Sequence, residues 1–232
     1  MLQSRVMSIA PQARTAVVVA DAPVGDLEPF RALLQATDLI ITADGGARHV
    51  LALSLLPQLA VGDFDSLAPE LLQQLEAANV QIEHHPAHKD ETDLELALLA
   101  AIERGAGRIV VLAALGGRPD QHLANLQLLT HPALGHADVR LLQDGWEVFV
   151  IRSYAHIIGT PGDTVSLLPM TDEVQGIVTE GLYYPLQHET LRLGPARGVS
   201  NVLVDHEAEV RVGTGLLLCM HEVGNREQGT EG

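Results

Sequence analysis

The sequence contains one cysteine and no long apolar run. Because Cys219 has no second cysteine to pair with, an internal disulfide is excluded, and its apolar surroundings predict a buried structural thiol in a reducing compartment. The longest apolar runs, such as 96–102, are far shorter than the ~18 residues that a membrane-spanning helix requires. The first residues lack the apolar stretch of a signal peptide. We therefore expect a cytoplasmic protein that does not enter the membrane.

Positive charge is also scarce. The chain has 14 Lys and Arg residues against 30 Asp and Glu residues, which gives a formal net charge of −16. Such a surface repels the phosphates of nucleic acids and the headgroups of anionic lipids, so we expect neither as a partner. An anionic substrate would have to be held locally, by a divalent cation, by helix N-termini or by a few basic side chains.

Two common nucleotide-binding motifs are absent. The sequence contains neither G-x-x-x-x-G-K-[ST] nor G-x-G-x-x-G, which excludes a Walker-type NTPase and the usual dinucleotide fingerprint. What is present is a globular composition, with 47% hydrophobic residues in a chain of 232. That length suffices for one large domain or two modest ones.

Residues 1–137 alternate strand-like apolar runs with helical patterns. The runs at 15–21, 38–44, 59–63 and 108–115 are almost continuously apolar, as expected for strands that are buried on both faces. Apolar residues at helical spacing mark the segments 26–36, 47–55, 69–78, 93–104 and 120–129. Repeated βα units form parallel sheets, so we predict an α/β domain with a doubly wound, mostly parallel sheet.

From residue 138 the pattern changes. Segments such as 145–154, 163–169 and 208–213 are short, rich in β-branched residues and separated by turn signals such as Thr160-Pro161-Gly162-Asp163. We predict an all-β sandwich lobe over 138–223, followed by a flexible polar tail over 224–232.

Acidic residues and glycines follow four of the predicted strands. They are Asp21, Asp44-Gly45-Gly46, Gly62-Asp63-Phe64-Asp65-Ser66 and Gly116-Gly117-Arg118-Pro119-Asp120. A single aspartate of this kind is more often a helix N-cap than a ligand. Because the carboxyl ends of parallel strands converge on one crevice, several carboxylates there would repel one another unless a cation lay among them. With oxygen ligands and no cysteine nearby, we expect Mg²⁺.

The glycine pairs indicate what the metal serves. Gly45-Gly46 and Gly116-Gly117 each lie between a strand and a helix, where a missing Cβ lets a ligand approach the backbone and a helix N-terminus can receive phosphate oxygens. This arrangement predicts a nucleotide site. Tight βα turns use glycine for structural reasons about as often, so that interpretation stays open as well.

The segment 89–95 combines a helix start with the chain's one lysine. Thr92 and Glu95 form a capping box, and Asp93 suits the positive end of the helix dipole. The cap does not explain Lys89. We interpret this residue as a cation that reaches a phosphate, with a solvated loop lysine as the alternative.

The histidines near these motifs have two interpretations each. His84, His85 and His88 could be zinc ligands, but no paired Cys/His cluster occurs elsewhere, and we favour an exposed connection between a strand and a loop. His122 lies early in a predicted helix, where a packed or capping histidine is favoured over a general base.

Seven motifs, in this order, resemble the thiamine pyrophosphokinase family. They are ADGGA at 43–47, VGDFDS at 61–66, KDETDLE at 89–95, GGRPDQHLAN at 116–125, GDTVSLLP at 162–169, GLYYPL at 181–186 and GVSN at 198–201. The resemblance implies transfer of diphosphate from ATP to the hydroxyethyl group of thiamine, which yields thiamine diphosphate and AMP. It also implies a homodimer whose sites are shared between the α/β lobe of one subunit and the β lobe of the other.

The resemblance implies roles for single residues as well. Asp63, Asp65 and Asp93 would hold Mg²⁺ and its water, and Lys89 and Arg118 would hold the polyphosphate. Asp120 would orient Arg118 or a metal-bound water. The remaining ATP-binding residues would be Asp44, Gly45, Gly46, Gly62, Thr92, Gly116, Gly117 and Asn125. Gln121 follows Asp120 where bacterial members often carry histidine, so no imidazole role is assigned to that position.

On the acceptor side, the resemblance implies that Ser200 and Asn201 in the β lobe bind thiamine. Taken alone, two short polar residues after a glycine are more typical of a turn between strands.

Two other functions fit the same nucleotide motifs. A related pyrophosphokinase that acts on a hydroxymethyl-pterin would keep the ATP site and differ in the acceptor lobe. A regulatory module would bind the nucleotide without turnover, and the complete set of Asp63, Asp65 and Asp93 disfavours it.

Overall fold

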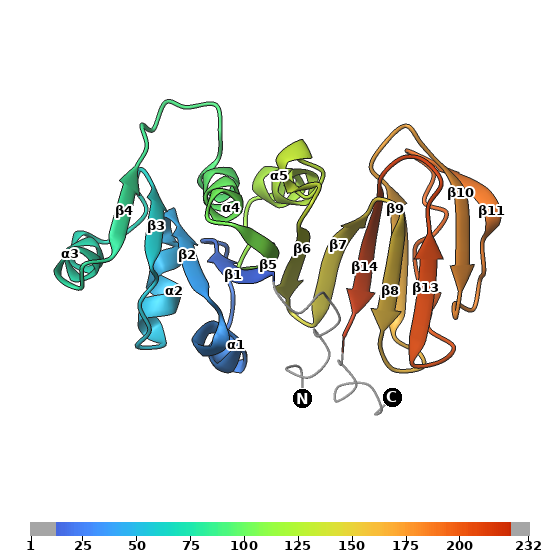
Figure 1. The fold of residues 1–232 in the computed structure, drawn as a ribbon, viewed down its shortest axis with the longest axis horizontal. Helices are drawn as coiled ribbons and strands as arrows, with labels where there is room; N and C mark the ends of the chain where they lie inside the picture. Colours follow the sequence, from blue (N-terminus) through green and yellow to red (C-terminus); the bar gives the residue numbers. More distant parts are fainter. Residues whose placement is uncertain (1–12, 224–232) are drawn as a thin grey trace. The chain divides into compact units, whose positions relative to one another are not determined.

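The computed structural model describes residues 13–223, which form two compact units (Figure 1). The first unit ends at Gln143 and the second begins at Asp144. The sequence places this boundary after residue 137. The difference arises because strand β6 (Asp138–Gln143) pairs in parallel with β5 (Ala106–Leu112) of the first unit. The predicted tail, 224–232, lies outside the described residues.

A parallel sheet forms the centre of the first unit, with the strand order β6-β5-β1-β2-β3-β4. The other strands are β1 (Arg14–Val19), β2 (Leu39–Ala43), β3 (Leu59–Gly62) and β4 (Gln81–His84). Every residue of β2 and β3 is buried, which explains their almost continuously apolar sequences. The predicted doubly wound, mostly parallel α/β lobe is confirmed.

Short helices connect these strands. They are η2 (Glu28–Phe30), α1 (Arg31–Ala36), η3 (Asp44–Gly46), α2 (Ala47–Ala52), α3 (Pro69–Ala77), α4 (Asp93–Glu103), α5 (Pro119–Leu128) and η4 (Pro132–Leu134), where η marks a 3₁₀ helix. Each of the five predicted helices is present, although the first starts as a 3₁₀ turn. Within residues 13–223, no helix is long and apolar enough to cross a membrane.

The order of the strands reverses at β1. From β1 the chain moves outward through β2, β3 and β4, and α4 then packs across β3, β2 and β1 on the way to β5. Because crossovers between parallel strands are right-handed, the two directions of travel place helices on both faces of the sheet (Figure 1). Ligands of open α/β sheets bind at the carboxyl ends of the strands beside such a reversal. The segments that follow β1, β2, β3 and β5 therefore meet at one edge.

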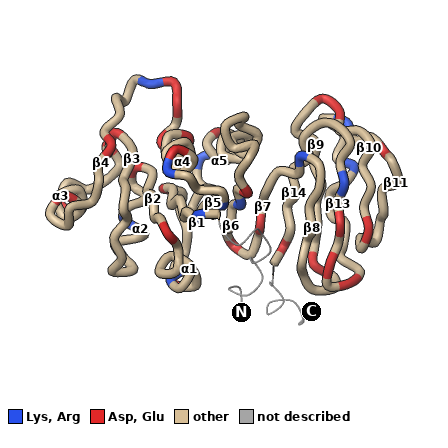
Figure 2. Tube along the Cα trace, viewed as in Figure 1, with Lys and Arg blue, Asp and Glu red and all other residues tan. Residues whose placement is uncertain are grey.

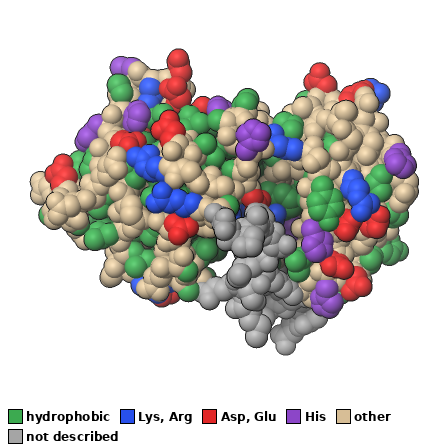
Figure 3. Space-filling model, viewed as in Figure 1, with side chains coloured by type: hydrophobic (Ala, Val, Ile, Leu, Met, Phe, Trp, Pro, Cys, Tyr) green, Lys and Arg blue, Asp and Glu red, His purple; other side chains and the backbone are tan. Residues whose placement is uncertain are grey.

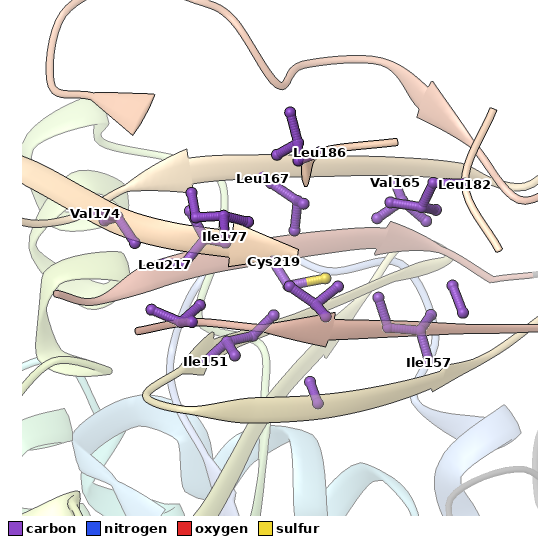
Figure 4. Packing of buried hydrophobic residues seen from close by; sticks show 14 of the residues in the cluster. Ile151, Ile157, Val165, Leu167, Val174, Ile177, Leu182, Leu186, Leu217 and Cys219 are labelled. Atoms are coloured by element: carbon purple, nitrogen blue, oxygen red, sulfur yellow. The ribbon is translucent and has the colours of Figure 1, made fainter. Parts of the chain in front are cut away.

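Two antiparallel sheets form the second unit, as predicted. One has the order β12-β9-β14-β7 and the other β11-β10-β13-β8. The strands are β7 (Trp146–Ile151), β8 (Tyr154–Ile158), β9 (Thr164–Pro169), β10 (Glu173–Glu180), β11 (Gln187–Arg192), β12 (Asn201–Val202), β13 (Glu207–Arg211) and β14 (Leu217–Glu222). Their apolar side chains, among them Ile151, Leu167 and Ile177, form one core (Figure 4). Cys219 is fully buried in it, as predicted.

Candidate functional site

The turn after β2 buries a carboxylate. Asp44 is 9% exposed, and its backbone has a φ of +45°, a left-handed conformation that is costly for a residue other than glycine. Its Oδ2 accepts a hydrogen bond from the Ser66 hydroxyl, whereas its buried Oδ1 has no hydrogen-bond partner among the described residues. A buried carboxylate oxygen without a donor is unfavourable, so this position favours a positively charged ligand.

Three aspartates meet at this edge of the sheet. Asp44, Asp63 and Asp93 each place one carboxylate oxygen within 4.8 Å of those of the other two. We call these three residues the acidic group. They follow β2 and β3 and begin α4, so the reversal of strand order brings them together.

The acidic group differs by one residue from the ligand set that the sequence predicts. Asp63 and Asp93 are in both, but the third member is Asp44, which the family resemblance places among the ATP-binding residues. Asp65 is exposed and lies outside the group. Repulsion from Asp63 and Asp44 nevertheless raises the pKa of the Asp65 carboxyl, which indicates that it faces the same region.

The acidic group fits a divalent cation. Three carboxylates at this spacing repel one another, and carboxylate oxygens are the ligands that Mg²⁺ prefers. Among residues 13–223, no other set of three or more Asp, Glu, His or Cys side chains is close enough to share an ion, and the ring nitrogens of His84, His85 and His88 do not come together as such a set. The ring of His84 instead packs at 74° against Phe64.

Lys89 contacts the acidic group through Asp93. Its Nζ lies 2.8 Å from Asp93 Oδ1, an ion pair that lacks hydrogen-bond geometry. Only 12% of the lysine side chain is exposed, so Lys89 is not a solvated loop residue. In the loop between β4 and α4, this basic position comes directly before an acidic segment (Figure 2). Thr92 is the N-cap of α4 and accepts a hydrogen bond from the Glu95 backbone at 3.2 Å, as the capping motif predicts.

The glycines of the β2–α2 turn are required for packing. A Cβ on Gly45 would lie 2.5 Å from the Asp21 carboxylate, and a Cβ on Gly46 would collide with the carbonyl oxygen of Val19. Gly62 has a φ of +155°, and a Cβ there would come within 3.1 Å of Asp44. The space where their side chains would lie is occupied by other atoms of the protein. Any contact of these glycines with a nucleotide would therefore be made by their backbone groups.

The loop after β5 presents an exposed ion pair. Gly116 and Gly117 have φ values of +95° and +68°, conformations that favour glycine. Arg118 then contacts Asp120 through two hydrogen bonds of 3.1 and 2.6 Å. Hydrogen bonding from Arg118 is the main reason why the pKa of the Asp120 carboxyl is lowered to about 2. Of the two roles predicted for Asp120, the geometry favours the orientation of Arg118.

Two neighbouring side chains hold this loop in place. Asn125 Nδ2 donates to the Ala114 carbonyl at 2.7 Å, and His122 Nδ1 accepts from the Gly116 backbone at 3.1 Å. His122 is therefore a packed histidine, the interpretation that the sequence favours. Asn125, predicted to bind ATP, supports the loop that carries Arg118.

The end of β1 contributes a second ion pair. Arg48 Nη2 lies 3.0 Å from Asp21 Oδ1 and 3.2 Å from the Asp21 carbonyl oxygen. The pKa of the Asp21 carboxyl is raised above its ordinary value, mainly by burial. The positive charge of Arg48 lowers this pKa, and the negative charge of Asp44 raises it. The sequence identifies Asp21 as a residue at a strand end but misses Arg48, whose one signal is its place directly after the ADGGA motif.

In the second unit, Asn201 is a structural support for its neighbours. It is 6% exposed; Oδ1 accepts from the backbone of Tyr184 and Val202, both at 2.9 Å, and Nδ2 donates to the Tyr184 carbonyl at 2.8 Å. Ser200 is exposed, with a φ of +60°, and its backbone N–H donates to Ser166 Oγ. Ser200 lies in a turn between strands, whereas Asn201 is the first residue of β12 and pairs with Val165 of β9.

Tyr184, whose backbone bonds to Asn201, belongs to an exposed aromatic pair to which the sequence assigned no role. Tyr183 and Tyr184 are 65% and 64% exposed, and their rings lie 4.8 Å apart at 83°. Two adjacent tyrosines in the GLYYPL motif were the available signal. Exposed aromatic faces of this kind bind flat or cationic ring systems.

Comparison with known proteins adds independent findings. Residues 30–141 match the family model described as "Thiamin pyrophosphokinase, catalytic domain", and residues 151–217 match "Thiamin pyrophosphokinase, vitamin B1 binding domain". The chain is 28% identical over 209 residues to "Thiamine pyrophosphokinase" of Bacillus subtilis, an alignment that covers 89% of this chain and 98% of the relative. It is 24% identical to "Thiamine pyrophosphokinase 1" of Oryza sativa, over 87% of this chain and 85% of that protein.

Solved structures show the same fold. The crystal structure of thiamine pyrophosphokinase from Bacillus subtilis superimposes with a TM-score of 0.80 at 26% identity, covering 90% of this chain and 99% of that one. The yeast thiamin pyrophosphokinase structure gives a TM-score of 0.79 at 16% identity, covering 93% and 88%.

Proposed function

Because the chain belongs to the thiamine pyrophosphokinase family, and is an enzyme of that type, we propose that it transfers the diphosphate group of ATP to the hydroxyethyl oxygen of thiamine. The products are thiamine diphosphate and AMP. The observation that carries this proposal is the acidic group at the reversal of strand order, with Lys89 beside it.

Transfer of this kind depends on positioning and on stabilisation of charge. The substrate hydroxyl oxygen attacks the β-phosphorus and gives up its proton to solvent. The bond from that phosphorus to the oxygen that bridges to the α-phosphorus breaks, so AMP leaves. Lys89 and Arg118 would hold the polyphosphate, and Asp120 would keep Arg118 in place. Asp44, Asp63 and Asp93 would hold Mg²⁺, with Asp65 nearby. Bound Mg²⁺ supplies positive charge that offsets the charge developing on the phosphate oxygens.

We place thiamine at the exposed tyrosines of the second unit. The thiazolium ring of thiamine is a flat cation, which suits the faces of Tyr183 and Tyr184. Asn201 would act through the backbone of Tyr184, and Ser200 would offer an exposed hydroxyl. We further propose a cytoplasmic homodimer in which the first unit of one subunit and the second unit of its partner complete each site.

The test is thiamine-dependent release of AMP. We expect the purified protein, incubated with ATP and Mg²⁺, to form AMP and thiamine diphosphate in equal amounts only when thiamine is added. AMP release with a hydroxymethyl-pterin but not with thiamine would support the alternative pyrophosphokinase. ATP binding without AMP release in either case would support the regulatory module.

Replacement of Lys89 by alanine is expected to lower kcat/KM for ATP by about tenfold or more, since charge-assisted hydrogen bonds contribute roughly 1.5–3 kcal/mol. Lys89→Arg should recover only part of the loss. Arginine keeps the positive charge, but its planar guanidinium does not reproduce the compact charge of lysine. Initial rates at varied ATP, with thermal unfolding of each variant, measure the effect. Unchanged kcat/KM in Lys89→Ala would show that the lysine only neutralises Asp93.

A further inference from the structure

Three basic side chains lie at the carboxyl edge of the first sheet, and each is held by a carboxylate. Arg118 pairs with Asp120, Lys89 with Asp93 and Arg48 with Asp21. The proposed function uses the first two pairs and leaves the third without a role. Figure 3 shows basic and acidic side chains close together on the visible face of the first unit.

We propose that Arg48 is a third cation that binds the polyphosphate of the nucleotide, with Asp21 as its positioning residue. This inference rests on the proposed function and deepens it. Arg48 is the second residue of α2, the helix that directly follows the turn carrying Asp44. Asp21 follows β1, the strand at which the strand order reverses and beside which ligands of this fold class bind.

The guanidinium of Arg48 is oriented but still available. Both of its contacts, to Asp21 Oδ1 and to the Asp21 carbonyl, use the same nitrogen, Nη2. The other guanidinium nitrogens have no hydrogen-bond partner among the described residues, and 44% of the side chain is exposed. Arginine presents several N–H donors in one plane, a geometry that matches phosphate oxygens, so one side of the fork can hold Asp21 while another contacts a ligand.

Asp21 is fixed more firmly than a surface carboxylate. Its carboxylate occupies the space left by the missing side chain of Gly45, and the Ser66 hydroxyl lies 3.4 Å from Oδ2 while it donates to Asp44. The tether of Arg48 is therefore built into the same turn as the acidic group. With 44% of the Arg48 side chain exposed, solvent screens the ion pair, which therefore contributes little to folding. Stability alone does not explain this arrangement.

The competing explanation is that Arg48 only neutralises Asp21, whose negative charge next to Asp44 would otherwise repel the nucleotide. Two variants separate the explanations. Arg48→Gln removes the cation and leaves Asp21 charged, whereas Arg48→Gln combined with Asp21→Asn removes both charges. If Arg48 contacts the polyphosphate, the double variant stays impaired. If it only neutralises Asp21, the double variant recovers.

We expect Arg48→Gln, alone and with Asp21→Asn, to weaken binding of Mg²⁺ with α,β-methylene-ATP by roughly tenfold, the loss expected for one charge-assisted contact. This analogue has no cleavable bond between the α- and β-phosphates, so calorimetric titration reports on Arg48 without turnover. Adenosine, which lacks phosphates, should bind all variants equally. KM for thiamine should stay within about twofold of wild type.

Arg31→Gln is the matched control, because Arg31 is similarly exposed and pairs with Glu28 outside the site. It should leave nucleotide affinity unchanged. Wild-type affinity in the double variant, or an equal loss for adenosine, would overturn the role of Arg48. Absence of thiamine-dependent AMP release by the wild-type protein would overturn the proposed function instead, and the titration distinguishes the two failures.

Discussion

Replacement of Asp63 by asparagine is expected to lower kcat by about 100-fold or more, the loss typical of removing one group that stabilises transition-state charge. Asp63 is a member of the acidic group, and its Oδ1 accepts a hydrogen bond from the Asp65 backbone at 3.2 Å. Asparagine keeps the shape and can keep that acceptor, so the change removes a charge and little else. Asp44→Asn should have an effect of the same order, because Asp44 Oδ1 is buried in the same group.

A second measurement distinguishes loss of the metal from loss of the fold. Without Mg²⁺, Asp63→Asn should unfold at the same temperature as wild type or a higher one, because the substitution relieves repulsion among three carboxylates. The rise in melting temperature that Mg²⁺ gives the wild type should be lost. Glu70→Gln, at an exposed position in the first turn of α3, is the control. Near wild-type turnover in Asp63→Asn with an intact fold would remove the metal assignment.

The edge of the sheet that carries the candidate site could be predicted from the sequence because it depends on local pattern. Apolar runs followed by Asp and Gly identify strand ends, and parallel sheets place these ends together. The same pattern does not predict which of the aspartates at this edge come close enough to share a cation. Asp44 joins the acidic group because its backbone adopts a left-handed turn that directs the side chain inward, whereas Asp65 follows Phe64, itself at a φ of +60°, and remains exposed.

Contacts between residues that are far apart in the sequence could not be predicted either. The contacts of Asn201 could not be predicted, because its side chain forms hydrogen bonds with the backbone of Tyr184, 17 residues away. The Asp21–Arg48 pair joins the end of β1 to α2, and the Asp21 carboxylate occupies space that the missing side chain of Gly45 leaves open. The apolar pattern of β6 fits a strand of either domain. Only its parallel pairing with β5 shows that it belongs to the first unit. Periodicity does not encode these contacts, since each depends on the packed arrangement.

Mixing two inactive variants is expected to restore about one quarter of wild-type activity if the subunits of a homodimer share their sites. One variant, Asp63→Asn, is defective in the acidic group of the first unit. The other replaces both Tyr183 and Tyr184 by alanine, in the second unit, where both rings are mainly exposed and their loss should leave the fold intact. After random exchange, half of the dimers contain one subunit of each kind. Each mixed dimer then has one intact site out of two.

AMP release at thiamine concentrations below KM measures the recovery, and subunits with different affinity tags demonstrate the exchange. Mixing wild type with the tyrosine variant should keep about one half of wild-type activity with or without exchange, so it is the control for loss of activity caused by mixing itself. If each site is completed within one chain, every site in the mixture keeps one defect, and no activity returns although mixed dimers form. A monomer at assay concentration would exclude shared sites as well. Recovery requires that the acidic group and the tyrosines act on the same substrates from different subunits, because no other combination in the mixture contains both intact halves.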